Sequence, residues 1–171
     1  MKKYIILICL IIASYMLNAQ EINKIEYDEI AEENILMAYC NKEGFTGDDF
    51  NYWFQDEYKH YTIDKETLEL LNSDSFSSLH IKAVMGTWCE DSQREIPRII
   101  KILDHLDYNF ENLTIIGVDK NKEAEGTKVD QLNIELVPTI IFYIDNKEIG
   151  RIIESPTESL EKDITNIIIG N

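Results

Sequence analysis

The sequence predicts an α/β protein in which helices flank a mixed central sheet, preceded by a helical N-terminal extension. Three observations support this fold class: the order of the elements, a strand–helix–strand unit, and a hairpin that follows it. From Leu79 onward, apolar and amphipathic segments follow the order strand, helix, strand, loop, strand, strand, helix. A strand–helix–strand unit pairs its strands in parallel, whereas a hairpin pairs them antiparallel. Both kinds of pairing then occur in one sheet, with helices on its faces.

Each element in the second half of the chain has its own signal. Strands are predicted at 81–85, 113–118, 139–144 and 148–153, where apolar and β-branched residues cluster. The turn at 145–147 joins the last two strands as a hairpin. Apolar residues at 96, 99, 100, 103 and 106 mark one face of a helix over 92–105. Charged residues 120–130 indicate a loop or a short surface helix, and Ser159 caps a last helix that ends near Ile169.

Residues 20–75 form an acidic extension that is mostly helical in pattern. Isoleucines recur at roughly helical spacing over residues 22–36. A second helix carries an aromatic stripe on one face, made of Phe50, Trp53, Phe54 and Tyr58. A stripe of this kind is typical of a packed core surface. Asp64 caps a short helix over 65–71, and the polar run 72–75 is a linker to the main domain at 76–171.

The first 19 residues have the anatomy of a secretory signal peptide. Lys2 and Lys3 form a basic start, residues 5–16 are apolar, and the small residue Ala19 offers a cleavage site. The apolar run is too short to span a bilayer comfortably, so an uncleaved anchor is the weaker alternative. We therefore expect an exported, periplasmic protein that is cleaved near Ala19 and keeps no stable membrane span.

The charge balance narrows the classes of partner. The chain carries 16 basic and 32 acidic residues, a net charge of −16. This excess of negative charge argues against nucleic acid or an anionic membrane surface as a partner. His60, His80 and His105 are not spaced like zinc ligands, so we expect neither a metal nor another cofactor.

Two cysteines remain once the signal is removed, Cys40 and Cys89. Cys89 stands between a predicted strand and a predicted helix. The free N–H groups and the positive dipole end of that helix stabilise a thiolate, which can bring a cysteine pKa below its free value of ~8.5. Glu90 and Asp91 oppose ionisation through their negative charge. The sequence leaves open which effect prevails at the sulfur.

Two prolines accompany this cysteine. Pro97 lies inside the predicted helix and is expected to kink it, because apolar periodicity continues on both sides. A helix that begins at Pro97 is the alternative. Pro138 directly precedes a strand that is predicted to be central in the sheet. A trans bond before it would be ordinary and a cis bond rarer, and the residues alone do not choose between them.

Together these segments resemble the active-site region of the thioredoxin family, over about residues 76–170. The resemblance rests on Trp88-Cys89-x-x-Ser92 after a strand, Pro97 in the next helix, and Val137-Pro138-Thr139 before a hairpin. It implies a thioredoxin-like fold, a cis Pro138 beside Cys89, and a Val137 backbone that pairs with an extended substrate. A wider set resembles an exported Bacteroidetes-type subgroup of that family: Gly86-Thr87-Trp88-Cys89, Asp91-Ser92, Glu95 and Pro97-Arg98.

The sequence departs from the family at two positions. Ser92 replaces the resolving cysteine, so the implied attack on a disulfide remains while the release step is lost. The Ser92 hydroxyl is instead a candidate hydrogen-bond donor to the thiolate. Ala83 stands where many thioredoxins carry a buried acid. Three interpretations of Cys40 remain open: a resolving thiol, half of a structural disulfide with Cys89, or a small buried residue without a role at the site.

The resemblance therefore implies a thiol–disulfide oxidoreductase acting through Cys89 alone, with Trp88 and Ser92 beside it and Val137 and Pro138 holding the substrate. Its partners would be oxidised protein thiols or small thiols, and an external thiol reductant would resolve the mixed disulfide. The alternative is a binding module that keeps the fold, has lost catalysis, and docks a partner protein through the acidic, aromatic extension. Exposure and reactivity of Cys89 separate the two.

Overall fold

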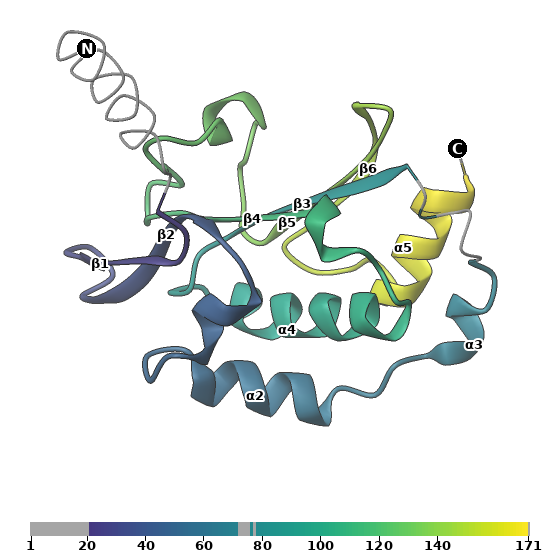
Figure 1. Cartoon of the computed structure of the whole chain (residues 1–171), viewed down its shortest axis with the longest axis horizontal. Helices are drawn as coiled ribbons and strands as arrows, with labels where there is room; N and C mark the ends of the chain where they lie inside the picture. Colours follow the sequence, from purple (N-terminus) through teal and green to yellow (C-terminus); the bar gives the residue numbers. More distant parts are fainter. Residues whose placement is uncertain (1–20, 72–75, 77, 171) are drawn as a thin grey trace, which may run out of the picture.

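The computed structural model describes residues 21–71, 76 and 78–170, and a mixed sheet of six strands forms its centre (Figure 1). The strands are β1 (Lys24–Asp28), β2 (Glu33–Cys40), β3 (Leu79–Met85), β4 (Leu113–Gly117), β5 (Thr139–Ile144) and β6 (Lys147–Ile153). Their order across the sheet is β1-β2-β4-β3-β5-β6. β3 and β4 run parallel, and the other neighbouring pairs are antiparallel. The predicted mixed sheet flanked by helices is confirmed.

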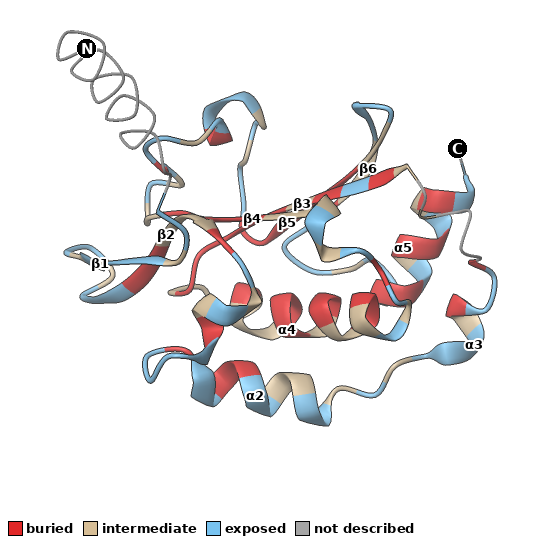
Figure 2. Cartoon of the chain, viewed as in Figure 1, coloured by how far each residue is buried: buried red, intermediate tan, exposed pale blue. Residues whose placement is uncertain are grey.

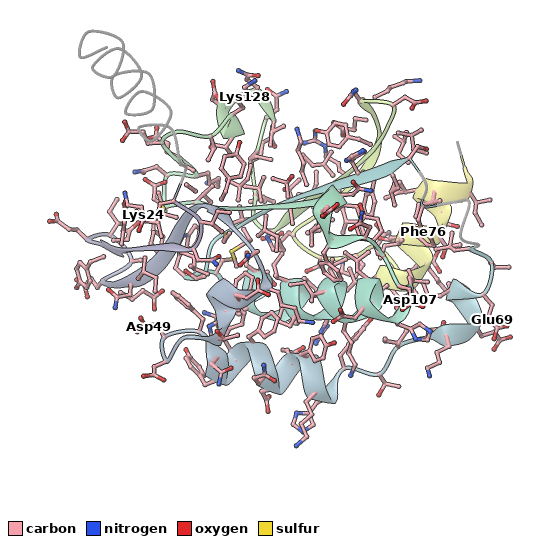
Figure 3. All side chains as sticks on the ribbon, viewed as in Figure 1. Lys24, Asp49, Glu69, Phe76, Asp107 and Lys128 are labelled. Atoms are coloured by element: carbon pink, nitrogen blue, oxygen red, sulfur yellow. The ribbon has the colours of Figure 1, made fainter. Side chains whose placement is uncertain are left out.

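The longer helices of the described residues gather on one side of the sheet. α4 (Glu90–His105) runs under the strands, α2 (Asn51–His60) packs against α4, and α5 (Leu160–Ile169) contacts β6 and the short α3 (Lys65–Leu68) (Figure 1). The segment between β4 and β5 lies over the opposite side (Figure 1) and includes the 3-10 helix η4 (Val129–Gln131). Lys128 marks the outer end of that segment in Figure 3. Two further 3-10 helices are η1 (Lys42–Thr46) and η3 (Phe110–Asn112).

Two hydrophobic clusters follow from this arrangement. Figure 2 shows the buried residues in the strands and along α4. The larger cluster lies between the sheet and the helices and includes Phe45, Phe54, Ile96, Ile100, Phe142 and Ile164. The smaller cluster consists of Val84, Ile116, Val118, Ala124, Val129 and Val137, with Trp88 and Cys89 packed against it. Successive residues of a strand point to opposite faces, so Ala83 belongs to the larger cluster and Val84 to the smaller. Cys89 therefore borders the face of the sheet opposite α2, α4 and α5.

The N-terminal segment contains strands where the sequence predicts a helix. Residues 24–40 form the antiparallel hairpin β1–β2, so the helical prediction for residues 22–36 is wrong. Apolar Ile25 and Tyr27 alternate with charged residues, which is the two-residue period of a strand. The Asp28 carboxylate accepts hydrogen bonds from two backbone N–H groups of the turn, at 2.7 and 2.8 Å. A short acidic side chain that closes a turn in this way favours a hairpin over a continuous helix.

The other predicted elements are present, with ends that differ by a few residues. α2 is the predicted aromatic helix, and Asp64 caps α3 by accepting from a backbone N–H of its first turn at 3.2 Å. α3 ends at Leu68, so it is shorter than predicted. Ser159 caps α5 in the same way, also at 3.2 Å. The predicted linker at 72–75 and the predicted signal peptide at 1–19 lie outside the described residues.

α4 continues through Pro97 from Glu90 to His105. The alternative in which a helix begins at Pro97 is therefore wrong. Ile96 and Ile99, on either side of the proline, are both buried in the larger cluster, so the apolar face is continuous across it. Within the part of the chain that the structure describes, none of the helices combines the length and the apolar character that crossing a membrane requires.

Candidate active site at Cys89

Cys89 stands at the junction of β3 and α4. β3 ends at Met85 and α4 begins at Glu90, so Cys89 is the N-cap residue of the helix. Its backbone N–H donates to the carbonyl of Gly86 at 3.0 Å, and its carbonyl accepts from the N–H of Gln93 at 2.9 Å. The side chain is half-buried and the thiol is free. The sulfur is thus carried at the helix end where backbone N–H groups lack intrahelical partners.

The loop before β5 brings Val137 and Pro138 to this cysteine. The Cys89 thiol donates a hydrogen bond to the carbonyl oxygen of Val137 at 3.2 Å. The peptide bond between Val137 and Pro138 is cis. The carbonyl of Pro138 accepts from the backbone N–H of Glu154 at 2.7 Å, which ties the loop to the residues after β6. Two segments that are remote in the sequence therefore meet at the sulfur.

Trp88 forms one wall of the site. Its indole N–H donates to the carbonyl of Val118 at 2.9 Å. The ring lies so close to Gly86 that a Cβ added there would overlap the indole. The Lys120 ammonium lies 4.3 Å from the centroid of the Trp88 ring, a cation–π distance. The indole is therefore held in place by the end of β4 and by the glycine beneath it.

Ser92 is turned into the protein. Its side chain is fully buried, and its Oγ accepts a hydrogen bond from the backbone N–H of Gly86 at 3.3 Å. No hydrogen bond between the described residues joins this hydroxyl to the Cys89 sulfur. Because the oxygen acts as an acceptor toward Gly86, the O–H remains available as a donor. Donation to a Cys89 thiolate stays a prediction.

The acidic first turn of α4 is partly neutralised. Oδ1 of Asp91 lies 2.6 Å from a guanidinium nitrogen of Arg94. Arg94 also donates to Oγ of Ser155 at 2.8 Å and to Oε1 of Glu95 at 2.7 Å. Glu95 is buried, and its Oε2 has no hydrogen-bond partner among the described residues. The pair with Arg94 offsets the charge of Asp91, one of the two acids expected to oppose ionisation at Cys89.

Cys40 lies elsewhere in the fold. It ends β2, belongs to the larger hydrophobic cluster and is 7% exposed. Its thiol faces the carbonyls of Ala38 and Ile115 at 3.6 and 3.8 Å, and burial raises its pKa to about 12. Both cysteines are free, so the structural disulfide with Cys89 is not formed. The interpretation of Cys40 as a small buried residue fits these contacts, and a resolving role for Cys40 gains no support from them.

A cavity of about 410 Å³ lies beside Cys40 rather than beside the Trp88–Cys89 loop. Lys42 and Asp104 line it and form an ion pair at 2.5 Å. The described residues contain no group of three histidine, cysteine, aspartate or glutamate side chains placed to hold a metal ion.

Two contacts that the sequence reasoning missed join the N-terminal hairpin to the site. Oγ1 of Thr87 accepts from the backbone N–H of Leu36 in β2 at 3.2 Å. Oδ2 of Asp28 accepts from the backbone N–H of Lys120, also at 3.2 Å. Thr87 directly precedes Trp88, and Lys120 covers its ring. The two-residue alternation in β1 was the available signal for this hairpin, and the helical interpretation of residues 22–36 obscured it.

No protein-family model and no curated protein matches the sequence. Similar solved structures include a thioredoxin-2 of the malaria parasite, at 15% identity and a TM-score of 0.41, covering 55% of this chain and 84% of that one. A thioredoxin of Fasciola hepatica has 18% identity and a TM-score of 0.39, covering 60% of this chain and 89% of that one. Trxlp of Edwardsiella tarda has 15% identity and a TM-score of 0.40, covering 63% of this chain and 94% of that one. The similarity of the chain to these solved structures is therefore distant.

Proposed function

We propose that this chain is a thioredoxin-like thiol–disulfide protein that acts through Cys89 alone. The observation that carries the proposal is the 3.2 Å contact between the Cys89 thiol and the Val137 carbonyl, at the N-terminus of α4. It places a free, half-buried thiol beside the Val137–Pro138 segment. Val137 and Pro138 would hold an extended substrate chain next to the sulfur, and Trp88 would bound the other side.

The proposed reaction is the first half of thiol–disulfide exchange. The Cys89 thiolate attacks one sulfur of a substrate disulfide and forms a mixed disulfide with it. The other substrate sulfur leaves as a thiolate and takes up a proton. An external thiol then attacks the substrate sulfur of the mixed disulfide, forms a new disulfide with the substrate, and releases Cys89 as a thiolate. Oxidised protein thiols or small thiols are the proposed partners.

The external thiol is needed because the described residues place no second cysteine sulfur beside Cys89. Ser92 supplies a buried hydroxyl where a resolving cysteine would stand, and Cys40 is buried with a pKa raised to about 12. The same observation favours a second candidate function, a binding module in which Cys89 no longer turns over. Reactivity of Cys89 decides between the two.

The proposed location is the periplasm, after removal of the signal peptide near Ala19. The mass of the mature protein, purified from the periplasm of a Gram-negative host, tests this directly. An intact N-terminus that begins at Met1, or retention in the cytoplasm, would contradict it.

A disulfide with a chromophoric leaving thiol tests the proposed reaction. The wild-type chain should release one thiol per molecule and then stop, because the mixed disulfide persists. Adding a small-molecule thiol should restart release. Cys89→Ser should abolish the reaction, whereas Cys40→Ala should leave it unchanged and serves as the matched control.

Ser92→Cys provides a gain-of-function arm. It should shorten the lifetime of the mixed disulfide by allowing an internal disulfide with Cys89, without any external thiol. Release from the wild-type chain at the rate of an unfolded cysteine peptide, or the absence of a mixed disulfide by mass spectrometry, would overturn the oxidoreductase proposal in favour of the binding module.

A further inference from the structure

The β1–β2 hairpin extends past the C-terminal ends of β3 and β4, from which the loop to Cys89 leaves. β3 and β4 are parallel, so they end side by side at Met85 and Gly117, and the loop to Cys89 leaves from this edge. β2 runs in the opposite direction and pairs with β4 through residues 38–40. Residues 33–37 of β2, with β1 paired to them, therefore extend beyond the end of β4. The hairpin projects at the left of Figure 1.

Two hydrogen bonds join the β1–β2 hairpin to the residues around Trp88. Leu36 of β2 donates its N–H to Thr87, the residue before Trp88. Asp28, at the end of β1, accepts from the N–H of Lys120, whose ammonium lies over the Trp88 ring. The hairpin is thus a fixed extension of the wall that Trp88 forms beside Cys89.

The outer edge of β1 has no strand paired to it in the described part of the chain. Leu36 directs its N–H to Thr87, and its carbonyl lies against Gly117, so both groups point away from β1. Directly opposed residues of an antiparallel pair turn their backbone groups the same way, either toward each other or away. Ile25 is opposite Leu36 and therefore turns its N–H and C=O outward. Tyr27, two residues on, does the same, and such groups are a template for another strand.

The same two residues expose apolar side chains in an acidic setting. Ile25 is 48% exposed and Tyr27 is 63% exposed. Six acidic residues lie within residues 21–33: Glu21, Glu26, Asp28, Glu29, Glu32 and Glu33. Lys24, labelled on β1 in Figure 3, is the one cation of that stretch and pairs with Glu26. An incoming strand would therefore meet apolar groups on one face and net negative charge on the other.

We propose that the β1 edge binds an extended segment of a polypeptide substrate in which apolar side chains alternate with lysine or arginine. The segment adds to the sheet as a strand. Its backbone bonds to Ile25 and Tyr27, its apolar side chains pack opposite theirs, and its cations face Glu26 and the acidic turn. The identification of this polypeptide as a disulfide-bearing substrate rests on the proposed function of Cys89, whereas strand addition itself does not need the thiol.

A second copy of this chain fits the edge less well. Antiparallel pairing of two β1 strands over all five residues puts Glu26 opposite Glu26 of the other copy. Like charges directly opposite one another are destabilising. Two chains that each carry a net charge of −16 also repel one another. Charge complementarity therefore favours a basic partner.

Binding can be measured apart from the chemistry by using Cys89→Ser and a cysteine-free peptide that alternates valine and lysine. The peptide should shift the backbone NMR signals of Ile25 and Tyr27, and its affinity should fall with added salt. A peptide with glutamate in place of lysine should not bind. Equal binding of both peptides, absence of binding, or shifts away from β1 would each overturn the proposal.

Substitutions in β1 test whether the peptide binds at this strand. Ile25→Thr combined with Tyr27→Thr keeps good strand formers and should weaken peptide binding about tenfold, because two cross-strand apolar pairs are lost. Tyr52→Thr is the matched control, since Tyr52 is 69% exposed but lies on α2. An equal effect of both variants, or a dimer through β1 that competes with the peptide, would refute the proposed partner. Loss of exchange at Cys89 with intact peptide binding would instead refute the proposed function alone.

Discussion

A hydrogen bond from the Leu36 N–H to the Thr87 hydroxyl joins β2 to the loop that carries Cys89. The substitution Thr87→Val removes this hydrogen bond. Valine has nearly the same shape, so the main loss is the acceptor for the N–H of Leu36. Leu36 and Thr87 are 0% and 3% exposed, so water does not replace the hydroxyl. A buried N–H without a partner costs about 1–3 kcal/mol. We expect the free energy of unfolding to fall by about 2 kcal/mol, the middle of that range.

α5 supplies a matched control. Thr165 is also 3% exposed, but its hydroxyl has no hydrogen-bond partner among the described residues. Thr165→Val removes a buried polar group whose desolvation is uncompensated, so stability should stay the same or rise by about 1 kcal/mol. The two variants change the same atoms at the same burial. The difference between them therefore measures the hydrogen bond to Leu36.

Urea unfolding provides the assay, with the midpoint reporting stability and an unchanged m-value showing that both variants unfold from comparable states. Amide hydrogen exchange of Leu36 should become faster in Thr87→Val and remain as in the wild type in Thr165→Val. Stabilities of the two variants that agree within about 0.5 kcal/mol would refute the reasoning, because ordinary substitutions vary by that much. A larger loss in Thr165→Val would refute it as well.

Three further predictions concern the cysteines and the loop glycine. Burial raises the pKa of the Cys40 thiol from 9.0 to about 12. The protonated thiol therefore contributes its full stability to the folded state below pH 9. This contribution is lost as the pH rises toward the folded pKa, because the thiol ionises first in the unfolded chain. Relative to Cys40→Val, the wild type should lose about 1.4 kcal/mol per pH unit above pH 9 in urea titrations, and a constant difference would contradict this. Iodoacetamide should label Cys89 in the native protein and Cys40 only after unfolding, and native labelling of Cys40, mapped by mass spectrometry, would disprove its burial. Gly86→Ala should displace the Trp88 ring, shift its indole N–H signal and cost about 1–3 kcal/mol, whereas an unchanged NMR signal would show that the ring does not cover the glycine.

The sequence by itself determined the elements whose signals are local. The apolar face of α4 repeats every three or four residues, the β5–β6 hairpin has its turn residues, and Asp64 and Ser159 cap their helices. Such signals depend on backbone geometry within one or two turns, so they can be recognised without knowing the rest of the fold. The order of those elements was enough to predict the mixed sheet.

Part of the site could be predicted for the same reason. The strand before Cys89 and the helix after it place the cysteine at a helix N-terminus whatever else surrounds them. The approach of Val137 to the sulfur was available only through a resemblance, because a hydrogen bond between residues 48 positions apart leaves no local pattern.

Only the tertiary structure decided how the N-terminal segment serves the site. Residues 22–36 carry apolar spacing that a helix and a strand can share, and pairing with β2 and β4 settles it in favour of strands, since each strand completes its hydrogen bonds on a neighbour. The inward turn of Ser92, the burial of Cys40 and the contact of Thr87 with Leu36 likewise depend on partners from other elements. Hydrogen bonds and packing between distant segments decide these features, and one-dimensional periodicity does not encode them.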